Sequence, residues 1–237
     1  MIQFYAPDIE QTLQLPEDEA RHCIKVLRTR PGSLVEVIDG KGNRFTCRLL
    51  DDNPRHASVV IEERCAVTPA WSTHITVAVA PTKNMDRMEW LTEKLTEIGV
   101  NRIIPVLCRH SERKEIKIER LQRIAISAMK QSLKAQLPEI YPMTPLRHIV
   151  TDIDADMRFI AYCDPSIPRK LLAKEYKPGC KSVIILIGPE GDFDPEEIKE
   201  SLDSGYIPVT LGDNRLRTET AALVACDTFH IINQLKS

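Results

Sequence analysis

The sequence predicts an α/β protein in which a small N-terminal β unit precedes a mostly parallel sheet covered by helices. From residue 73 onward, apolar strand-like segments alternate with segments whose apolar residues recur at helical spacing. This is the pattern of a parallel sheet with helices on both faces. Before that point, three strand-like segments follow one another with tight turns, which favours a small β-barrel. A chain of 237 residues can hold two such domains, and we place them at residues 1–68 and 73–237.

The N-terminal domain is expected to contain one helix followed by three strands. Residues 15–28 are predicted to be helical, because Pro16 suits a first turn, acidic residues follow it, and an apolar stripe runs along one side. The strands are predicted at 33–39, 44–51 and 56–63. The sequence DGKGN at 39–43 is a strong signal for a hairpin turn between the first two strands. Residues 67–71 are predicted to be a linker.

The C-terminal domain is expected to alternate strands and helices along its whole length. The predicted strands cover residues 75–81, 102–108, 158–164, 182–188 and 207–212. The predicted helices cover residues 84–99, 117–134, 168–176, 194–205 and 218–235. The fourth helix has the most complete boundary signals, with Asp194 as N-cap and Pro195 in the first position. Glu197 stands at the capping-box position and Gly205 at the stop.

Composition narrows the class of protein. No apolar run approaches the roughly 20 residues of a membrane-spanning helix, and the N-terminus lacks the pattern of a signal peptide. We therefore expect a cytoplasmic protein without a membrane partner. The seven cysteines form no C-x-x-C pair, so we expect buried free thiols rather than disulfides or zinc. The cysteines in apolar or alternating contexts are Cys23, Cys47, Cys65, Cys163 and Cys226.

The histidines give no sign of a metal centre. The six histidines have no spacing typical of metal ligands, so no metal is expected. His230 lies on an apolar helix face and is expected to be a hydrogen-bonded core residue. The nucleophile motif G-x-S-x-G is also absent, so hydrolysis by an activated serine is poorly supported.

Two glycine-containing loops follow two consecutive apolar strands, at 187–193 and 211–220. Ligands of open α/β sheets bind at the carboxyl ends of strands, and a glycine lets a flat ligand approach the backbone. Any one glycine more often only turns the chain. Two such loops followed by Arg217, Thr218 and Glu219 at a helix N-terminus favour a binding site.

The two loops do not match the usual phosphate-binding motifs. Neither G-x-G-x-x-G after the first strand nor G-x-x-x-x-G-K-[ST] is present. Glu190 and Asp192 would repel a pyrophosphate. A ligand with a positive charge and an adenine-like face fits better, and a nucleotide-dependent oxidoreductase is disfavoured.

Five segments, taken in order, resemble the RsmE family, whose members methylate N3 of a uridine in 16S ribosomal RNA. These segments are 22–28, 83–100, 130–140, 186–193 and 211–222. Three departures are visible. Asp192 stands where the family often has a second glycine, and Lys130 replaces an acid. Arg215 falls one place after the family's usual first arginine, where Asn214 stands.

The resemblance implies a PUA-like, RNA-binding barrel in residues 1–68 and a SPOUT methyltransferase domain with a trefoil knot in residues 73–237. It also implies S-adenosylmethionine as cofactor, an obligate homodimer, and 16S ribosomal RNA or the small ribosomal subunit as partner. The apolar closing helix at 221–232 has few charges to face water, which agrees with a dimer. The alternative is a non-catalytic RNA-binding module with a degenerate cofactor pocket.

The resemblance also assigns residues to the site. The cofactor-binding residues implied are Pro81, Leu186, Ile187, Gly188, Pro189, Glu190, Gly191, Leu211, Gly212, Leu216 and Thr218. Arg217, Glu219 and Thr220 are the expected catalytic residues. An arginine could stabilise the uracil anion, and either Glu219 or a water could be the base. A first-turn helix acid that interacts with the dipole explains Glu219 at least as well.

A basic stretch at 102–134, with nine Lys or Arg and three Glu, is a further candidate surface. Taken alone, a charge run is more often a solvated helix face. With an RNA substrate it is expected to contact phosphates. The expected RNA-binding residues are Arg21, His22, Arg28, Lys83, Arg87, Arg109, Arg113, Lys114, Arg123 and Lys134.

Overall fold

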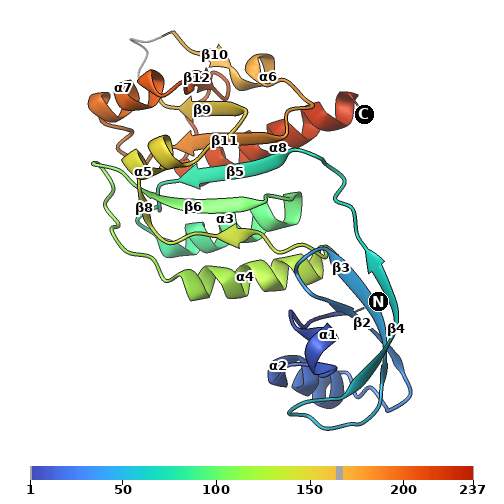
Figure 1. Cartoon of the computed structure of the whole chain (residues 1–237). Coiled ribbons are helices and arrows are strands. Elements are labelled where there is room, and N and C mark those ends of the chain that lie inside the picture. The colour runs from blue at the N-terminus through green and yellow to red at the C-terminus, as the bar shows by residue number, and fades with distance from the viewer. Residues whose placement is uncertain (1, 164–167, 237) are drawn as a thin grey trace. The chain divides into compact units, whose positions relative to one another are not determined.

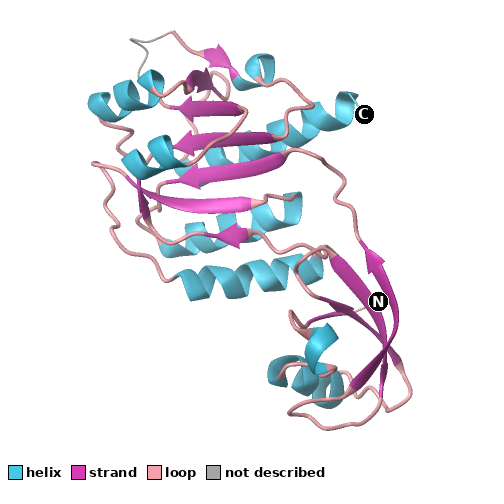
Figure 2. Cartoon of the chain, in the orientation of Figure 1, coloured by secondary structure: helices cyan, strands magenta, loops and turns pink. Residues whose placement is uncertain are grey.

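The computed structural model describes residues 2–163 and 168–236 (Figures 1 and 2). The chain divides into two compact units. The first unit comprises the residues up to Ala70 together with Ile126–Leu137, and the second comprises Trp71–Ala125 and the residues from Pro138 onward. Ile126–Leu137 thus belongs to the first unit, although it lies within the C-terminal domain predicted at residues 73–237.

A four-stranded sheet forms the centre of the first unit. Its strands, β1 to β4 in that order across the sheet, are Gln3–Tyr5, Leu34–Ile38, Asn43–Leu49 and Val59–Ala66. β1 pairs parallel with β2, and the other two pairs are antiparallel. A bridge between Gln14 and Ser58 extends the sheet beyond the start of β4. The N-terminal β unit expected from the sequence is thus a small β-sheet, in which β1 is a strand that the sequence did not predict.

The hairpin between β2 and β3 confirms the turn predicted at residues 39–43. The carboxylate of Asp39 accepts hydrogen bonds from the backbone N–H groups of Lys41 and Asn43, at 2.7 and 3.0 Å. Gly40 and Gly42 have φ values of +74° and +96°, a region that only glycine enters freely. A residue with a Cβ at either position would strain the turn.

The predicted helix at 15–28 is correct in place but irregular in form. α1 (Ile9–Thr12) was not predicted, and α2 (Glu17–Arg21) continues directly into a π-helical turn, η1 (His22–Val26). Pro16 precedes the first turn of α2. Lys130, at the end of the long helix α4 (Ile118–Gln131), places its Nζ 2.6 Å from Oε1 of Glu19 on α2. Lys130 therefore has a structural partner within the first unit.

A parallel sheet forms the centre of the second unit. Its longer strands are β5 (His74–Val79), β6 (Arg102–Leu107), β9 (Met157–Ala161), β11 (Ser182–Ile187) and β12 (Ile207–Thr210). The short strands are β7 (Glu139–Ile140), β8 (Thr144–Pro145) and β10 (Lys170–Leu171). The order across the sheet is β10-β12-β9-β11-β5-β6-β7, with β8 also paired to β6. This confirms the predicted parallel α/β architecture. Spacing along the chain could not predict the order, in which β11 lies between β5 and β9 (Figure 1).

The helices of the second unit are α3 (Met85–Ile98), the first part of α4, α5 (Leu146–Asp152), α6 (Leu172–Glu175), α7 (Pro195–Asp203) and α8 (Thr218–Lys236). The prediction of a helix at 168–176 is wrong for its first part. Lys170 and Leu171 instead form β10, because they pair with Val209 and Thr210 at the edge of β12. Only four residues after them are helical. α5 was not predicted.

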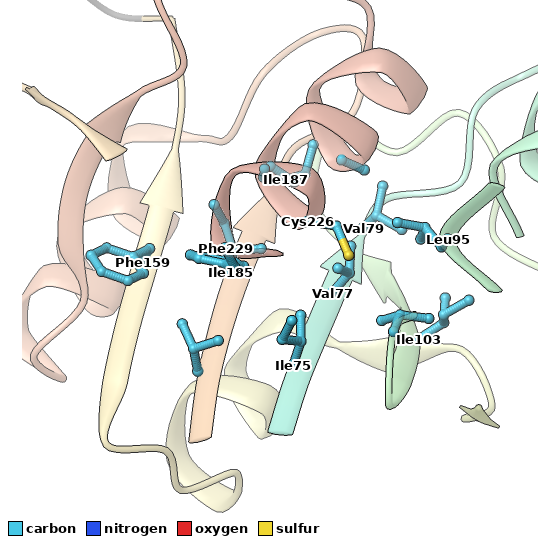
Figure 3. Close-up of a cluster of buried hydrophobic side chains, with 14 of the residues drawn as sticks. Ile75, Val77, Val79, Leu95, Ile103, Phe159, Ile185, Ile187, Cys226 and Phe229 are labelled. Atoms are coloured by element: carbon cyan, nitrogen blue, oxygen red, sulfur yellow. The ribbon is translucent and has the colours of Figure 1, made fainter. Parts of the chain in front are cut away.

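Both faces of this sheet are covered, as predicted. Ile75, Val77 and Val79 of β5 point to a core cluster that also contains residues of α3 and α8. Figure 3 shows these three side chains on the same side of the sheet as Cys226 and Phe229 of α8. Ala78 of β5, which lies between Val77 and Val79, belongs to a second cluster, which includes residues of α5 and α7. This alternation is the two-residue period of a strand.

The thiols are only partly buried. Cys23, Cys47 and Cys226 are buried, as predicted, but Cys65 and Cys163 are exposed. The prediction fails for these two because Cys65 lies in the outward-facing end of β4, and Cys163 lies beyond the end of β9. Within the described ranges, no cluster of three or more His, Cys, Asp or Glu side chains could hold a metal ion. The same ranges contain no helix long and apolar enough to cross a membrane.

His230 is the core residue that the sequence predicted. Its Nε2 lies 2.9 Å from the carbonyl oxygen of Gly99, and its ring meets Trp71 edge-on with ring centres 4.8 Å apart. The histidine thus links α8 to the end of α3.

Candidate functional site

A cavity of about 640 Å³ lies at the carboxyl ends of β9, β11 and β12, next to the N-terminus of α8. Three stretches of the second unit line it. The first runs from Ala161 to Cys163, with Pro168 and Arg169. The second comprises residues 187–190 and Asp192, at the end of β11 and in the loop after it, and the third runs through residues 209–218. The last two are the glycine-containing loops that the sequence singled out. The cavity therefore lies where parallel strands of an open α/β sheet bind ligands.

Nine of the predicted cofactor-binding and catalytic residues line this cavity. They are Ile187, Gly188, Pro189, Glu190, Leu211, Gly212, Leu216, Arg217 and Thr218. The remaining five do not line it: Pro81, Leu186, Gly191, Glu219 and Thr220. The stretch at 161–163 was missed, although its strand was predicted. Because that strand ends beside β11 and β12, only the order of strands across the sheet could have revealed its part in the site.

The absence of Leu186 and Gly191 from the lining has a physical reason. Successive side chains of β11 point to opposite faces of the sheet, so Leu186 packs among the residues of α5 and α7 while Ile187 reaches the cavity. Gly191 allows the loop to pack closely against His110, since a Cβ on this glycine would lie 3.3 Å from Cβ of His110. Pro81 is buried just beyond the end of β5.

The remaining two glycines of the loops differ in what they do. A Cβ on Gly188 would come within 3.0 Å of the ring of Phe193, so this glycine permits packing inside the loop. Gly212 has a φ of +132°, and a Cβ there would meet no atom within 4 Å. Its backbone conformation disfavours any other residue, and it lines the cavity.

Thr218 joins two of the lining stretches at the start of α8. Its Oγ1 donates a hydrogen bond to the carbonyl oxygen of Gly188 at 3.1 Å, and Thr218 is 6% exposed. Glu190 makes a second connection, because its Oε1 accepts the backbone N–H of Lys83 at 3.2 Å. The loop after β11 is thereby fixed to α8 on one side and to the loop after β5 on the other.

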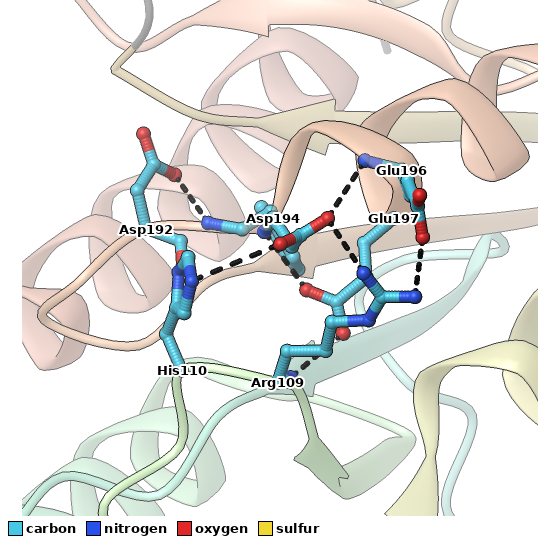
Figure 4. A network of polar contacts seen from close by, with 7 residues as sticks. Arg109, His110, Asp192, Asp194, Glu196 and Glu197 are labelled. Atoms are coloured by element: carbon cyan, nitrogen blue, oxygen red, sulfur yellow. Dashed lines mark hydrogen bonds and ion pairs between the residues drawn. The ribbon is translucent and has the colours of Figure 1, made fainter.

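A polar network holds the loop after β6 against the N-terminus of α7 (Figure 4). The guanidinium of Arg109 contacts Glu196 and lies 3.1 Å from Oδ1 of Asp194. The hydrogen bond that Arg109 donates to Glu196, with the charges of Glu196 and Asp194, raises the pKa of Arg109 above its usual value. The backbone N–H of Arg109 donates to Oε1 of Glu197 at 2.8 Å. Arg109 is thus already engaged by the acids of α7.

The boundary signals of α7 are confirmed within this network. The side chain of Asp194 accepts the backbone N–H of Glu196 at 2.9 Å, and the side chain of Glu197 accepts that of Asp194 at 2.9 Å. Pro195 is the first helical residue. Burial, and secondly the charge of Glu197, raise the pKa of the Cys108 thiol next to this network.

The three expected catalytic residues occupy different environments. Arg217 is exposed and lines the cavity. Glu219 is 7% exposed, its Oε1 lies 3.7 Å from Nε of Arg87 on α3, and its Oε2 has no hydrogen-bond partner within the described structure. Thr220 follows it on α8, outside the lining. The site thus brings only Arg217 of the three to the cavity itself.

The expected RNA-binding residues divide between the two units. Arg21, His22, Arg28 and Lys134 belong to the first unit, and the others to the second. Arg21 pairs with Glu17 on its own helix, at 2.8 Å.

Within the second unit, several of these side chains already have partners. Lys83 pairs with Glu112 at 3.0 Å, and Arg113 donates to the carbonyl oxygen of Lys83 at 2.7 Å. Arg123 donates to a carbonyl of its own helix. Lys114 is exposed and forms no ion pair with the residues that the structure describes.

Known proteins resemble this chain over nearly its whole length. A model of the RNA methyltransferase domain matches residues 69–230, and a model of the RNA methyltransferase PUA domain matches residues 15–62. The ribosomal RNA small subunit methyltransferase E of Buchnera aphidicola is 28% identical over 225 residues, which is 92% of this chain and 87% of the relative. A probable rRNA-methyltransferase from Porphyromonas gingivalis, whose crystal structure is known, is 44% identical with a TM-score of 0.95, and each chain is covered completely.

The chain belongs to the RsmE family.

Membership of the RsmE family confirms the resemblance read from the sequence, including the N-terminal PUA domain. A further RsmE protein, from Neisseria gonorrhoeae, has a crystal structure described as bound to S-adenosyl methionine. It shares a TM-score of 0.86 and 28% identity with this chain, and 98% of each chain is covered. Another RsmE relative, from Bacillus subtilis, is 25% identical over 225 residues, which is 90% of this chain and 88% of that protein.

Proposed function

We propose that this protein transfers the methyl group of S-adenosylmethionine to N3 of a uridine in 16S ribosomal RNA. The observation that carries the proposal is the cavity at the carboxyl ends of β9, β11 and β12 in a chain of the RsmE family. Its volume of about 640 Å³ lies within the range of small-molecule sites. Relatives of the same family are described as bound to this cofactor.

The lining of the cavity fits S-adenosylmethionine. Apolar side chains of Ile187, Leu211 and Leu216 offer surface to an adenine ring. Glu190 places negative charge in the same cavity, where a sulfonium cation would be favoured. The bound cofactor supplies an electrophilic methyl group.

Arg217 and the N-terminus of α8, which begins at Thr218, are proposed to prepare the uracil for attack. N3 of uracil must give its proton to a base, either a water or Glu219, before it can attack, so negative charge develops on the ring. The guanidinium of Arg217 and the N-terminus of α8 lie at the cavity and would stabilise that charge. Glu219 is the less supported catalytic candidate, because it lies outside the cavity lining and its carboxylate faces Arg87.

The proposal has direct tests. We expect 16S ribosomal RNA from a deletion strain to lack one methyl group at a uridine, and the restored protein to return it, as mapped by mass spectrometry. In calorimetry, S-adenosylmethionine is expected to bind, whereas NAD and ATP are not. An intact RNA affinity without any S-adenosylmethionine binding would instead identify a non-catalytic RNA-binding module.

The basic surface is proposed to contact RNA phosphates, and Lys114 and Arg109 offer a matched comparison. Lys114→Ala should weaken RNA binding and reduce the salt slope of log Kd by about one unit, because one phosphate contact is lost. Arg109→Ala should change that slope less, since Asp194 and Glu196 already engage its guanidinium. Titrations at several salt concentrations decide this. A slope that Lys114→Ala leaves unchanged would make the lysine an ordinary solvated side chain.

We further propose that the protein acts as a homodimer. Trp90 on α3 is 42% exposed, and Ile231 and Leu235 on α8 are 48% and 80% exposed. Because α3 and α8 pack together, these exposed apolar side chains offer surface to a second copy. Sedimentation should show a dimer at micromolar concentration, and an active monomer would contradict this.

Three finer points complete the proposal. The first unit is proposed to be a PUA-like barrel that binds RNA.

The C-terminal segment is proposed to pass through a loop as a trefoil knot. The course of the chain supports the knot. From β11 the chain crosses to β12, on the far side of β9, and α8 then returns to pack against β5 and β11. A crystal structure in which the C-terminal segment does not pass through a loop of the backbone would contradict the knot. Because ribosomal RNA of bacteria lies in the cytoplasm, the proposal places the protein there.

A further inference from the structure

We infer that Asp192 is a positioning residue, which ties the end of β9 to the loop after β11 and so holds one wall of the cofactor cavity. The inference rests on the proposed function, because it gives the cavity to S-adenosylmethionine. The contact that carries it runs from the backbone N–H of Cys163 to Oδ2 of Asp192, at 2.8 Å. Both residues line the cavity. They come from stretches 29 residues apart in the sequence.

The backbone of Asp192 is fixed from two other directions. Its N–H donates to the carbonyl oxygen of Pro189 at 2.9 Å, which closes a turn inside the loop. Its carbonyl oxygen lies 3.1 Å from Nδ1 of His110, in the loop after β6 (Figure 4). The glycine before it allows this approach, since a Cβ at Gly191 would lie 3.3 Å from His110. The carboxylate therefore projects from an anchored backbone.

The residue type at this position is itself informative. Asp192 has a φ of +64°, in the left-handed region where glycine is the ordinary residue. Among other residues, Asp and Asn enter this region most readily. A glycine would satisfy the backbone but would leave the N–H of Cys163 without this acceptor. The aspartate satisfies both requirements.

The carboxylate acts here as a hydrogen-bond acceptor. Its two oxygens accept backbone N–H groups, Oδ2 from Cys163 and Oδ1 from Phe193 at 2.9 Å. Within the described residues, Asp192 forms no ion pair. Its effect on the cavity is therefore geometric: it holds the Tyr162–Cys163 segment as a preformed wall. A wall that must first be ordered by the ligand weakens binding.

Two substitutions separate the side-chain bond from the backbone conformation. Asp192→Gly keeps the left-handed backbone and removes the acceptor. Asp192→Asn keeps the conformation and one acceptor oxygen, which is enough for the bond to Cys163, while the bond from the N–H of Phe193 within the same loop is lost. We expect Asp192→Gly to bind S-adenosylmethionine about tenfold more weakly, and Asp192→Asn to stay within about threefold of wild type. At saturating cofactor, kcat of both variants should match wild type, because Asp192 does not act on the reacting atoms.

A second measurement reports on the bond without any ligand. Exchange of the Cys163 amide proton, followed by NMR in the free protein, should be faster in Asp192→Gly by about tenfold or more, and near wild type in Asp192→Asn. Unchanged exchange in Asp192→Gly would overturn the inference. So would an Asp192→Asn variant as weak in cofactor binding as Asp192→Gly, because charge would then be responsible. If wild type binds no S-adenosylmethionine but the exchange result holds, the proposed function fails and the tie between the two segments stands.

Discussion

Replacing Arg217 by alanine is expected to lower kcat by roughly two to three orders of magnitude, as loss of one donor to a developing anion does. Arg217 lines the cavity directly before α8 begins. Its charge and the helix N-terminus both favour a deprotonated uracil ring over a neutral one. The effect therefore belongs to the transition state, and cofactor affinity should change little.

Two further variants make the result specific to Arg217. Arg217→Lys should recover only part of the rate, because an ammonium lacks the planar fork that can span N3 and a neighbouring oxygen. Arg215→Ala is the matched control, since Arg215 is an exposed arginine of the same loop that also lines the cavity. Single-turnover methylation of ribosomal RNA measures all three. If Arg217→Ala reacts at close to the wild-type rate while Arg215→Ala is slow, the role belongs to Arg215.

Replacing Gly212 by valine is expected to weaken S-adenosylmethionine binding by about a hundredfold or more, by filling space that a ligand needs. Gly212 lines the cavity, and a Cβ built on it would meet no protein atom within 4 Å. A valine side chain would therefore add bulk at the cavity lining without meeting a protein atom that could hold it back. The φ of +132° also strains any residue other than glycine, so some loss of stability is expected as well.

The Gly179→Val variant is a control that separates two effects of Gly212→Val, the blocking of the cavity and the strain of the backbone. Gly179 has a φ of +91°, and a Cβ there also meets no atom within 4 Å, but it does not line the cavity. Both variants should show a lower Tm, and only Gly212→Val should lose cofactor affinity in calorimetry. Equal affinity of the Gly212→Val variant and the wild type would show that the ligand does not occupy this end of the cavity.

Local chemistry made some elements predictable. The α7 boundary was correct because Asp194 and Glu197 satisfy backbone N–H groups of their own helix. The hairpin was correct because Asp39 and two glycines act within five residues. Contacts between distant segments were not predictable in this way. The pairing of Lys170 with Val209 turned an expected helix into a strand.

The candidate site divides in the same manner. The two glycine-containing loops could be found, because each carries its signal in consecutive residues. The wall at Tyr162 and Cys163 could not, because it joins the site only through the order of strands across the sheet. Both Leu186 and Ile187 were predicted to bind the cofactor. Only Ile187 lines the cavity, because the two side chains point to opposite faces of β11.

The place of β11 at the centre of the sheet also governs the order in which the second unit can assemble. β11 pairs with β5 on one side and β9 on the other, and both of these are synthesised before it. Until residue 187 has emerged from the ribosome, β5 and β9 each have an edge without its final neighbour. Pairing partners this far apart in sequence slow folding, and uncovered strand edges invite association with other chains. A nascent chain that ends before Ser182 is therefore expected to be prone to aggregation.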